Sequence, residues 1–188
     1  MDARVKVRPQ EGVAPVPAIR SVGVVGAGQM GNGISHVISL AGYDVKLYDL
    51  KKEAIDKALD TIRRNMTRQV SRGLIKDSDM QTALKRITPI SAINGLGTAD
   101  LVIEAATEDE AIKRKIFAEL CPHLKKGALL ASNTSSISIT RLAASSDRPE
   151  RFIGMHFMNP VPLMQLVELI RGIATEDDTF ATARAFVE

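Results

Sequence analysis

The feature that most constrains the fold is a set of closely spaced glycines near the N-terminus. Gly26, Gly28 and Gly31 form a Gly-x-Gly-x-x-Gly motif that directly follows the apolar run at residues 21–25. After the motif, apolar side chains recur with helical spacing as far as Ala41. A strand that enters a glycine turn and continues as a helix opens a doubly wound α/β domain, so the motif predicts that fold class.

The rest of the chain alternates short apolar runs with segments of helical periodicity. We expect further strands near residues 43–49, 101–103, 128–131, 152–155 and 166–170. We expect helices near residues 55–70, 77–87 and 112–124 and from residue 175 onward, the last opened by Thr175 and Asp178 as a capping pair. The strands are apolar on both faces, which is typical of a parallel sheet covered by helices on both sides. The sequence therefore predicts one Rossmann-type domain with a mostly parallel sheet over residues 19–188, after a flexible leader at residues 1–18.

Composition excludes several classes of protein. The single cysteine, Cys121, rules out an internal disulfide and is typical of a reducing compartment, so we expect a cytoplasmic protein. No apolar run reaches the roughly 20 residues that a membrane-spanning helix needs, so no membrane partner is expected. The first twenty residues lack the apolar core of a secretory signal. A net charge of only +3 does not indicate nucleic-acid binding, and no metal site is predicted.

An acidic residue lies where the second strand is expected to end. Asp49 follows Gly31 by 18 residues, the position at which a Rossmann domain holds the ribose hydroxyls of adenosine. In such a domain Gly26 allows the tight turn, Gly28 lets the backbone approach the pyrophosphate, and Gly31 brings helix and strand together. We therefore predict NAD as the cofactor, because the 2′-phosphate of NADP would meet a carboxylate. The two lysines that follow Asp49 weaken this preference, and a glycine turn without a ligand is the alternative.

Polar residues follow the strand expected at 128–131. The segment Ser132-Asn-Thr-Ser-Ser136 comes directly after that strand, where residues of a doubly wound sheet face the ligand crevice. Asn133 and Ser135 are therefore candidates for hydrogen bonds to a substrate or to nicotinamide. The alternative is that these residues only cap a short helix that begins near Ile137. The sequence leaves both interpretations open.

A histidine and a glutamate lie in the last two apolar runs. His156 ends one run, and Glu168 follows twelve residues later among apolar neighbours. A carboxylate in such surroundings is costly without a partner, and a nearby imidazole is the obvious one. A carboxylate that holds a histidine produces an oriented general base. A purely structural pair is the alternative.

The positive charge is concentrated in one segment. Residues 51–76 contain eight Lys or Arg and three Asp or Glu, a segmental charge of 8 − 3 = +5. This is either a solvated helix face or a surface for a polyanionic small molecule.

Taken together, these segments resemble the L-3-hydroxyacyl-CoA dehydrogenase family, and most of all its 3-hydroxybutyryl-CoA dehydrogenase branch. The resemblance covers about residue 19 to the end. It rests on Gly26-Ala-Gly-Gln-Met-Gly-Asn-Gly33, Ser132-Asn-Thr-Ser-Ser-Ile-Ser-Ile139, His156-Phe-Met-Asn-Pro-Val-Pro162 and Leu166-Val-Glu168. It implies the reversible, NAD-dependent oxidation of an (S)-3-hydroxyacyl-CoA, of short chain such as 3-hydroxybutyryl-CoA, to the 3-ketoacyl-CoA.

The resemblance also implies roles for individual residues. His156 is the catalytic base and Glu168 its carboxylate partner, while Ser135 and Asn159 contact both substrate and nicotinamide. The implied cofactor contacts besides these are Gly26, Gly28, Gln29, Met30, Gly31, Asp49, Glu108 and Lys113. Asn65 and Arg72 occupy the places on the long helix where the family binds CoA, which gives the basic segment a partner.

The family continues into an all-helical domain that closes over the acyl chain and forms most of a dimer interface. This sequence ends where the approach to that domain begins. The resemblance therefore implies a homodimer for the full-length enzyme, with the helical domain absent from this chain. An NAD-binding module that is inactive alone is the alternative. A third alternative is a purely structural protein, as the lens crystallins of this superfamily are. The pair of His156 and Glu168 argues against this alternative.

Overall fold

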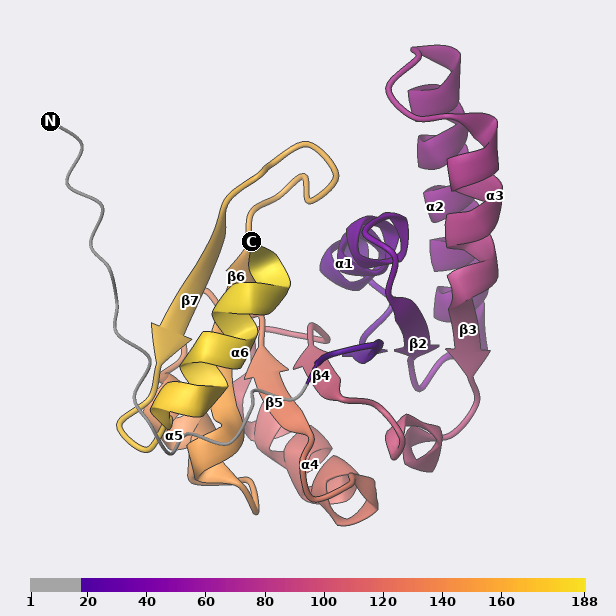
Figure 1. Ribbon diagram of the computed structural model, residues 1–188. Coiled ribbons are helices and arrows are strands. Elements are labelled where there is room, and N and C mark those ends of the chain that lie inside the picture. The colour runs from indigo at the N-terminus through magenta and orange to yellow at the C-terminus, as the bar shows by residue number, and fades with distance from the viewer. Residues whose placement is uncertain (1–17) are drawn as a thin grey trace, which may run out of the picture.

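The computed structural model describes residues 18–188, and its strands form a single sheet of seven (Figure 1). The leader predicted at residues 1–18 thus lies outside the described residues except for Ala18. The sheet order is β3-β2-β1-β4-β5-β6-β7. The strands are β1 (Ser21–Val25), β2 (Asp44–Tyr48), β3 (Ile87–Ile90), β4 (Leu101–Glu104), β5 (Leu129–Ser132), β6 (Phe152–Phe157) and β7 (Val167–Arg171). β1 to β6 are parallel, and β7 pairs antiparallel with β6. The predicted doubly wound, mostly parallel sheet is confirmed.

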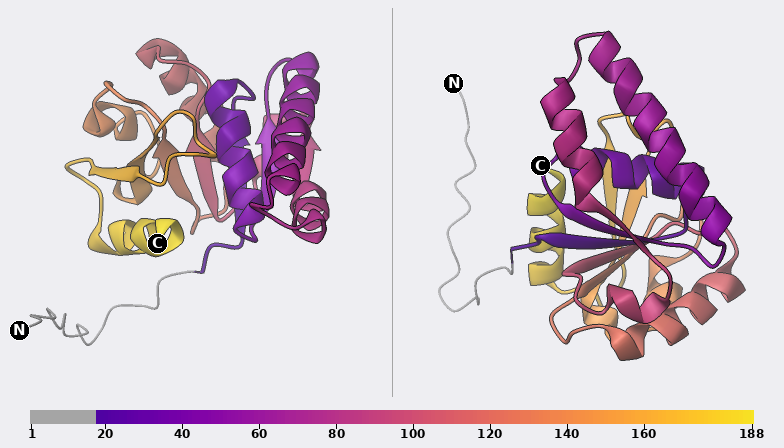
Figure 2. Two further views of the ribbon diagram at one scale, coloured as in Figure 1. Left: turned by 90° about the horizontal axis from the view of Figure 1, so that it is seen from above. Right: turned by 90° about the vertical axis from the view of Figure 1, so that its right-hand side faces the viewer.

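Helices cover both faces of the sheet (Figure 2). One core cluster joins one face to α1 (Gln29–Leu40), α2 (Lys52–Ser71), α3 (Asp77–Arg86) and α6 (Asp177–Val187). The other joins the opposite face to α4 (Glu110–Leu120), α5 (Ile139–Ala143) and the 3-10 helices η1 (Ile93–Leu96) and η2 (Cys121–His123). A third 3-10 helix, η3 (Pro149–Arg151), leads into β6. α2 and α3 lie side by side and extend beyond the sheet (Figures 1 and 2).

The glycine motif forms the predicted turn between β1 and α1. Gly26 has φ 101°, a backbone conformation that glycine adopts without steric cost. A Cβ at Gly31 would lie 1.8 Å from the carbonyl oxygen of Gly26, so only glycine lets α1 start this close to the turn. Nothing lies within 4 Å of the corresponding position at Gly28, so the turn is open on that side.

The structure differs from the sequence-based expectation at two elements. The helix predicted at 77–87 ends at Arg86, and the chain continues as the edge strand β3, which was not predicted. Pro89 in that strand cannot donate a ladder hydrogen bond, and an edge position tolerates this. The capping pair predicted for α6 is wrong, because Thr175 Oγ1 donates to Phe152 O (2.7 Å) and accepts from Gly172 N (2.8 Å) instead.

No helix among residues 18–188 is long and apolar enough to cross a membrane. In the same part of the chain no group of three or more His, Cys, Asp or Glu side chains is arranged to hold a metal ion.

Candidate cofactor-binding and active site

The candidate site lies at the carboxyl ends of the strands, where the strand order reverses between β1 and β4. Ligands of doubly wound domains bind at this crossover point. A pocket of about 370 Å³ opens there. It brings together the predicted site residues Gly28, Gln29, Met30, Glu108, Lys113, Ser135, His156 and Asn159.

Asp49 braces the glycine turn. Its Oδ2 accepts a hydrogen bond from Ala27 N (2.8 Å), and its Oδ1 accepts one from Lys51 N (3.0 Å). Each carboxylate oxygen retains a second lone pair, so Asp49 can still accept a ribose hydroxyl. Lys52, one of the two lysines that weakened the preference for NAD, pairs with Asp56 at 2.7 Å. The open turn at Gly28, the amino end of α1 and the adjacent carboxylate fit a dinucleotide with an unphosphorylated ribose.

Glu108 organises the loop that follows β5. Its Oε1 accepts hydrogen bonds from Thr134 Oγ1 (2.6 Å), from Ser135 N (3.0 Å) and Oγ (3.3 Å), and from Ser136 N (3.1 Å) and Oγ (3.0 Å). Burial by itself raises the pKa of the Glu108 carboxyl, but these hydrogen bonds and the charge of Lys113 hold the pKa below its ordinary value. Glu108 therefore stays ionised at neutral pH and fixes Ser135 at the pocket wall.

Residues 132–136 do not cap α5, because Ser138 does so by accepting from Arg141 N at 3.3 Å. Thr134 caps the turn before it, since its Oγ1 accepts from Ile137 N at 2.9 Å. The side-chain oxygen of Asn133 is already occupied by a hydrogen bond from the protein backbone. That oxygen accepts from Phe157 N at 2.8 Å, while Asn133 N donates to Glu104 O at 2.8 Å. Asn133 thus ties the end of β6 to that of β5, next to His156.

Glu104, at the end of β4, lies behind the pocket and was not predicted from the sequence. It is fully buried and accepts hydrogen bonds from Lys113 Nζ (2.6 Å), Ser132 Oγ (2.8 Å) and Ala106 N (2.8 Å). A glutamate that ends an otherwise apolar strand, with a serine ending the next one, was the available signal.

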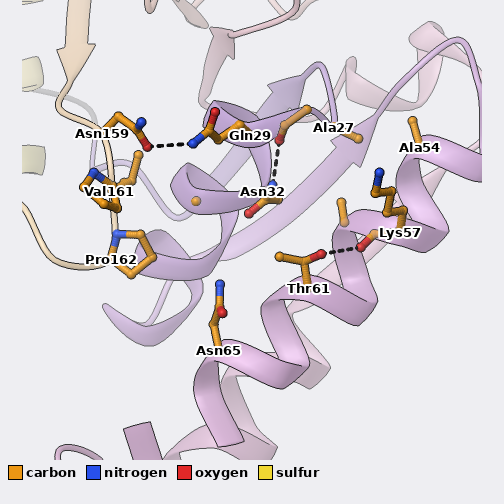
Figure 3. Close-up of a pocket in the computed structure, with 14 residues that line it drawn as sticks. Ala27, Gln29, Asn32, Ala54, Lys57, Thr61, Asn65, Asn159, Val161 and Pro162 are labelled. Atoms are coloured by element: carbon orange, nitrogen blue, oxygen red, sulfur yellow. Dashed lines mark hydrogen bonds between the residues drawn. The ribbon is translucent and has the colours of Figure 1, made fainter. Parts of the chain in front are cut away.

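His156 and Glu168 face each other across the antiparallel pair of β6 and β7. Nδ1 of His156 lies 2.9 Å from Oε2 of Glu168. The predicted pairing is present, but the expected burial of Glu168 is wrong, since 52% of its side chain is exposed on the edge strand. Nearby, Gln29 Nε2 donates to Asn159 Oδ1 at 3.1 Å, which joins the start of α1 to the segment after β6 (Figure 3).

Two further pockets extend the site along α2. A pocket of about 530 Å³ lies between α1, α2 and the segment after β6, and Figure 3 shows Asn65 on α2 at its edge, near Pro162. It shares Gly28, Gln29 and Asn159 with the first pocket. A third pocket of about 250 Å³ shares Asn65 with the second and reaches Arg72. The predicted CoA residues therefore line a path of adjoining pockets that leads toward His156.

The chain is similar to 3-hydroxyacyl-CoA dehydrogenases throughout the described domain. Residues 21–188 match the family model described as "3-hydroxyacyl-CoA dehydrogenase, NAD binding domain". The 3-hydroxybutyryl-CoA dehydrogenase of Bradyrhizobium diazoefficiens is 58% identical over 90% of this chain and 58% of that protein. A probable 3-hydroxybutyryl-CoA dehydrogenase of Deinococcus radiodurans is 47% identical over 84% of this chain and 56% of that protein.

Among solved structures, (S)-3-hydroxybutyryl-CoA dehydrogenase of Ralstonia eutropha superimposes with a TM-score of 0.89 at 44% identity, covering 90% of this chain and 60% of that one. The chain thus spans somewhat more than half the length of the curated relatives that it matches. The resemblance inferred from the motifs is confirmed, and the chain belongs to the family of NAD-binding domains of 3-hydroxyacyl-CoA dehydrogenases.

Proposed function

We propose that this chain is the cofactor-binding and catalytic part of an enzyme that reversibly oxidises a short-chain (S)-3-hydroxyacyl-CoA, such as 3-hydroxybutyryl-CoA, to the 3-ketoacyl-CoA. The observation that carries the proposal is the pocket that runs from the glycine turn to His156, whose Nδ1 is paired with Glu168. NAD, when bound, supplies the acceptor for the hydride that leaves C3 of the substrate. The cofactor contacts proposed are Gly26, Gly28, Gln29, Met30, Gly31, Asp49, Glu108, Lys113, Ser135 and Asn159.

His156 accepts the proton of the substrate hydroxyl. With a proton on Nδ1 donated to Glu168, the other ring nitrogen of His156 is an acceptor that can take the hydroxyl proton. Glu168 holds the ring in this orientation and stabilises the imidazolium that forms. Ser135, fixed by Glu108, and Asn159, held by Gln29, orient the substrate oxygen beside it.

The CoA part of the substrate lies along α2 in this proposal. Asn65 and Arg72 are seven residues apart, about 10 Å along a helix, and line adjoining pockets on the way to His156. Arg68 shares the outer pocket with Arg72, which places two cations where phosphates would lie.

A second candidate function is cofactor binding without turnover by this chain alone. It is favoured by the half-exposed side chain of Glu168, because an ion pair in contact with water orients its histidine weakly. We propose that a second, helical domain covers this site in the complete enzyme and forms its homodimer interface, in keeping with the greater length of the relatives. We also propose that the enzyme acts in the cytoplasm, since its one cysteine, Cys121, is free and buried.

The test uses the full-length enzyme and three variants. His156→Gln should lower kcat by about 10²- to 10⁴-fold while NAD affinity stays nearly unchanged, because the cofactor's phosphates and ribose bind at the glycine turn. Glu168→Gln should lower kcat by a similar order, and the double variant should cost little more than His156→Gln alone. His123→Gln, which changes an exposed histidine on η2, is the control. A double variant that shows the full product of both losses would refute the proposed pair.

A further inference from the structure

Three charged side chains lie together between β4 and α4, beneath the pocket that reaches His156. Lys113 Nζ is 2.6 Å from Glu104 Oε2 and 3.9 Å from Glu108 Oε2. We call Glu104, Lys113 and Glu108 the charge cluster. Two carboxylates share one ammonium, so the cluster carries −1 + 1 − 1 = −1 when all three groups are ionised.

Glu104 neutralises Lys113 inside the protein. Both side chains are essentially inaccessible to water, at 0% and 2% exposure. The partners of Glu104 are all donors, namely Lys113 Nζ, Ser132 Oγ and Ala106 N, which is the arrangement that an ionised carboxylate requires. A buried charge needs a partner of opposite sign. Lys113 lies closer to Glu104 than to Glu108, so it pairs with Glu104.

Glu108 is therefore left as the excess negative charge, and it borders the pocket. Its side chain is 43% exposed, and its hydrogen bonds from Thr134, Ser135 and Ser136 favour the ionised form. Besides Glu108 and Lys113, His156 is the remaining titratable side chain that lines this pocket within residues 18–188. His156 is paired with another carboxylate, Glu168, so the pocket contains no uncompensated positive charge.

On the proposed function, the nicotinamide end of the cofactor occupies this pocket. The pocket begins at Gly28 and Gln29 of the turn that fits the pyrophosphate, and it ends at His156, where the hydride must be accepted. The nicotinamide ring is cationic in the oxidised cofactor and neutral in the reduced one, whereas the rest of the molecule keeps its charge. The electrostatic energy of the two forms in the pocket therefore differs only through the charge of this ring.

We propose that the net charge of the cluster raises the affinity of the pocket for the oxidised cofactor relative to the reduced one, and that Glu104 sets this charge from below by neutralising Lys113. The inference rests on the proposed function. It makes the cofactor's redox preference a property of the cluster as a whole. A group that never touches the cofactor, Glu104, then changes that preference as strongly as one that borders the pocket, Glu108.

The experiment measures the dissociation constants of NAD⁺ and NADH by calorimetry and follows the ratio Kd(NADH)/Kd(NAD⁺). Glu108→Gln and Glu104→Gln each bring the cluster to zero charge, and each should lower this ratio on the order of tenfold, the effect of one unit charge across several ångströms of partly solvated pocket. The double variant Glu104→Gln/Lys113→Met removes one charge of each sign and keeps −1. It should retain the wild-type ratio, even where both affinities fall.

Several outcomes would overturn the inference. One is a folded Glu104→Gln variant with the wild-type ratio. That result would mean that Glu108 acts by its own contact with the cofactor and that the net charge of the cluster does not set the ratio. If Glu104→Gln does not fold, the comparison of Glu108→Gln with the double variant decides, and equal ratios in those two proteins contradict the inference. A wild-type chain that binds neither NAD⁺ nor NADH would refute the proposed function itself, and the inference with it.

Discussion

Substitution of Asp49 should separate an effect on stability from an effect on cofactor binding. Asp49 accepts hydrogen bonds from Ala27 N and Lys51 N, and on the proposed function it also accepts from the adenosine ribose. Lys51 is exposed, so water replaces the lost partner of its N–H in Asp49→Ala. Ala27 is buried at 5% exposure, so its N–H is left without an acceptor.

The expected magnitudes follow from these partners. An unsatisfied buried N–H costs about 1–3 kcal/mol, so Asp49→Ala should lower Tm by roughly 4–8 °C for a loss near 2 kcal/mol. A charge-assisted hydrogen bond to the ribose is worth roughly 1.5–3 kcal/mol, so NAD affinity should fall about 10- to 100-fold. Asp49→Asn keeps one oxygen for Ala27 N and removes the charge. It should retain most of the stability but lose discrimination against NADP.

The assay is titration calorimetry with NAD and NADP, combined with thermal unfolding of the same proteins. Asp44→Ala is a matched control, because Asp44 is exposed at the opposite end of β2. Its NAD affinity should equal that of the wild type. Equal affinity of the wild-type chain for NAD and NADP, or unchanged NAD affinity in Asp49→Ala, would refute the role of Asp49 in cofactor selection.

Three further predictions concern other parts of the site. Gly31→Ala should destabilise the fold by about 1–3 kcal/mol in urea unfolding, because its Cβ would meet Gly26 O, whereas Gly28→Ala should keep the stability and lose NAD affinity. In the full-length enzyme, Arg72→Glu should weaken acetoacetyl-CoA binding more at low salt than at high salt. The control Arg64→Glu changes a residue of α2 outside the pockets and should weaken this binding less. Equal effects of the two substitutions would count against a CoA path along α2. Burial lowers the pKa of His36 below 6.5 despite a hydrogen bond with Gln69, so the unfolded chain binds a proton that the folded chain does not, and stability should fall as pH drops through about 6.5. Urea unfolding at pH 7 and pH 5.5 should show a smaller difference for His36→Gln than for wild type, and an undiminished one would contradict this assignment.

Local sequence determined most of the secondary structure and the position of the site along the chain. The glycine turn is specified by residues within one strand-turn-helix unit, and α2 by apolar side chains at helical spacing over twenty residues. The parallel sheet follows from apolar strands that alternate with helices, and the crossover point follows from that topology. These features depend on neighbours in the sequence, which is why they were predictable.

Other features depended on which strand lies beside which. β3 contains Pro89 and becomes a strand only because β2 offers it a parallel partner at the edge of the sheet. The reversed direction of β7 places Glu168 opposite His156, so a pair twelve residues apart meets at 2.9 Å on an exposed edge rather than in the core. Periodicity alone did not distinguish an edge strand from a buried one, and Glu168 was therefore expected to be buried.

The contacts within the charge cluster were decided by tertiary structure. Glu104, Lys113 and Ser132 come from β4, α4 and β5, so no pattern within one element shows that they meet. They meet because β5 lies beside β4 and because α4 packs against this face of the sheet, so that the ammonium of Lys113 reaches a fully buried carboxylate. A buried ion pair requires both partners in one place, and only the folded chain brings them there.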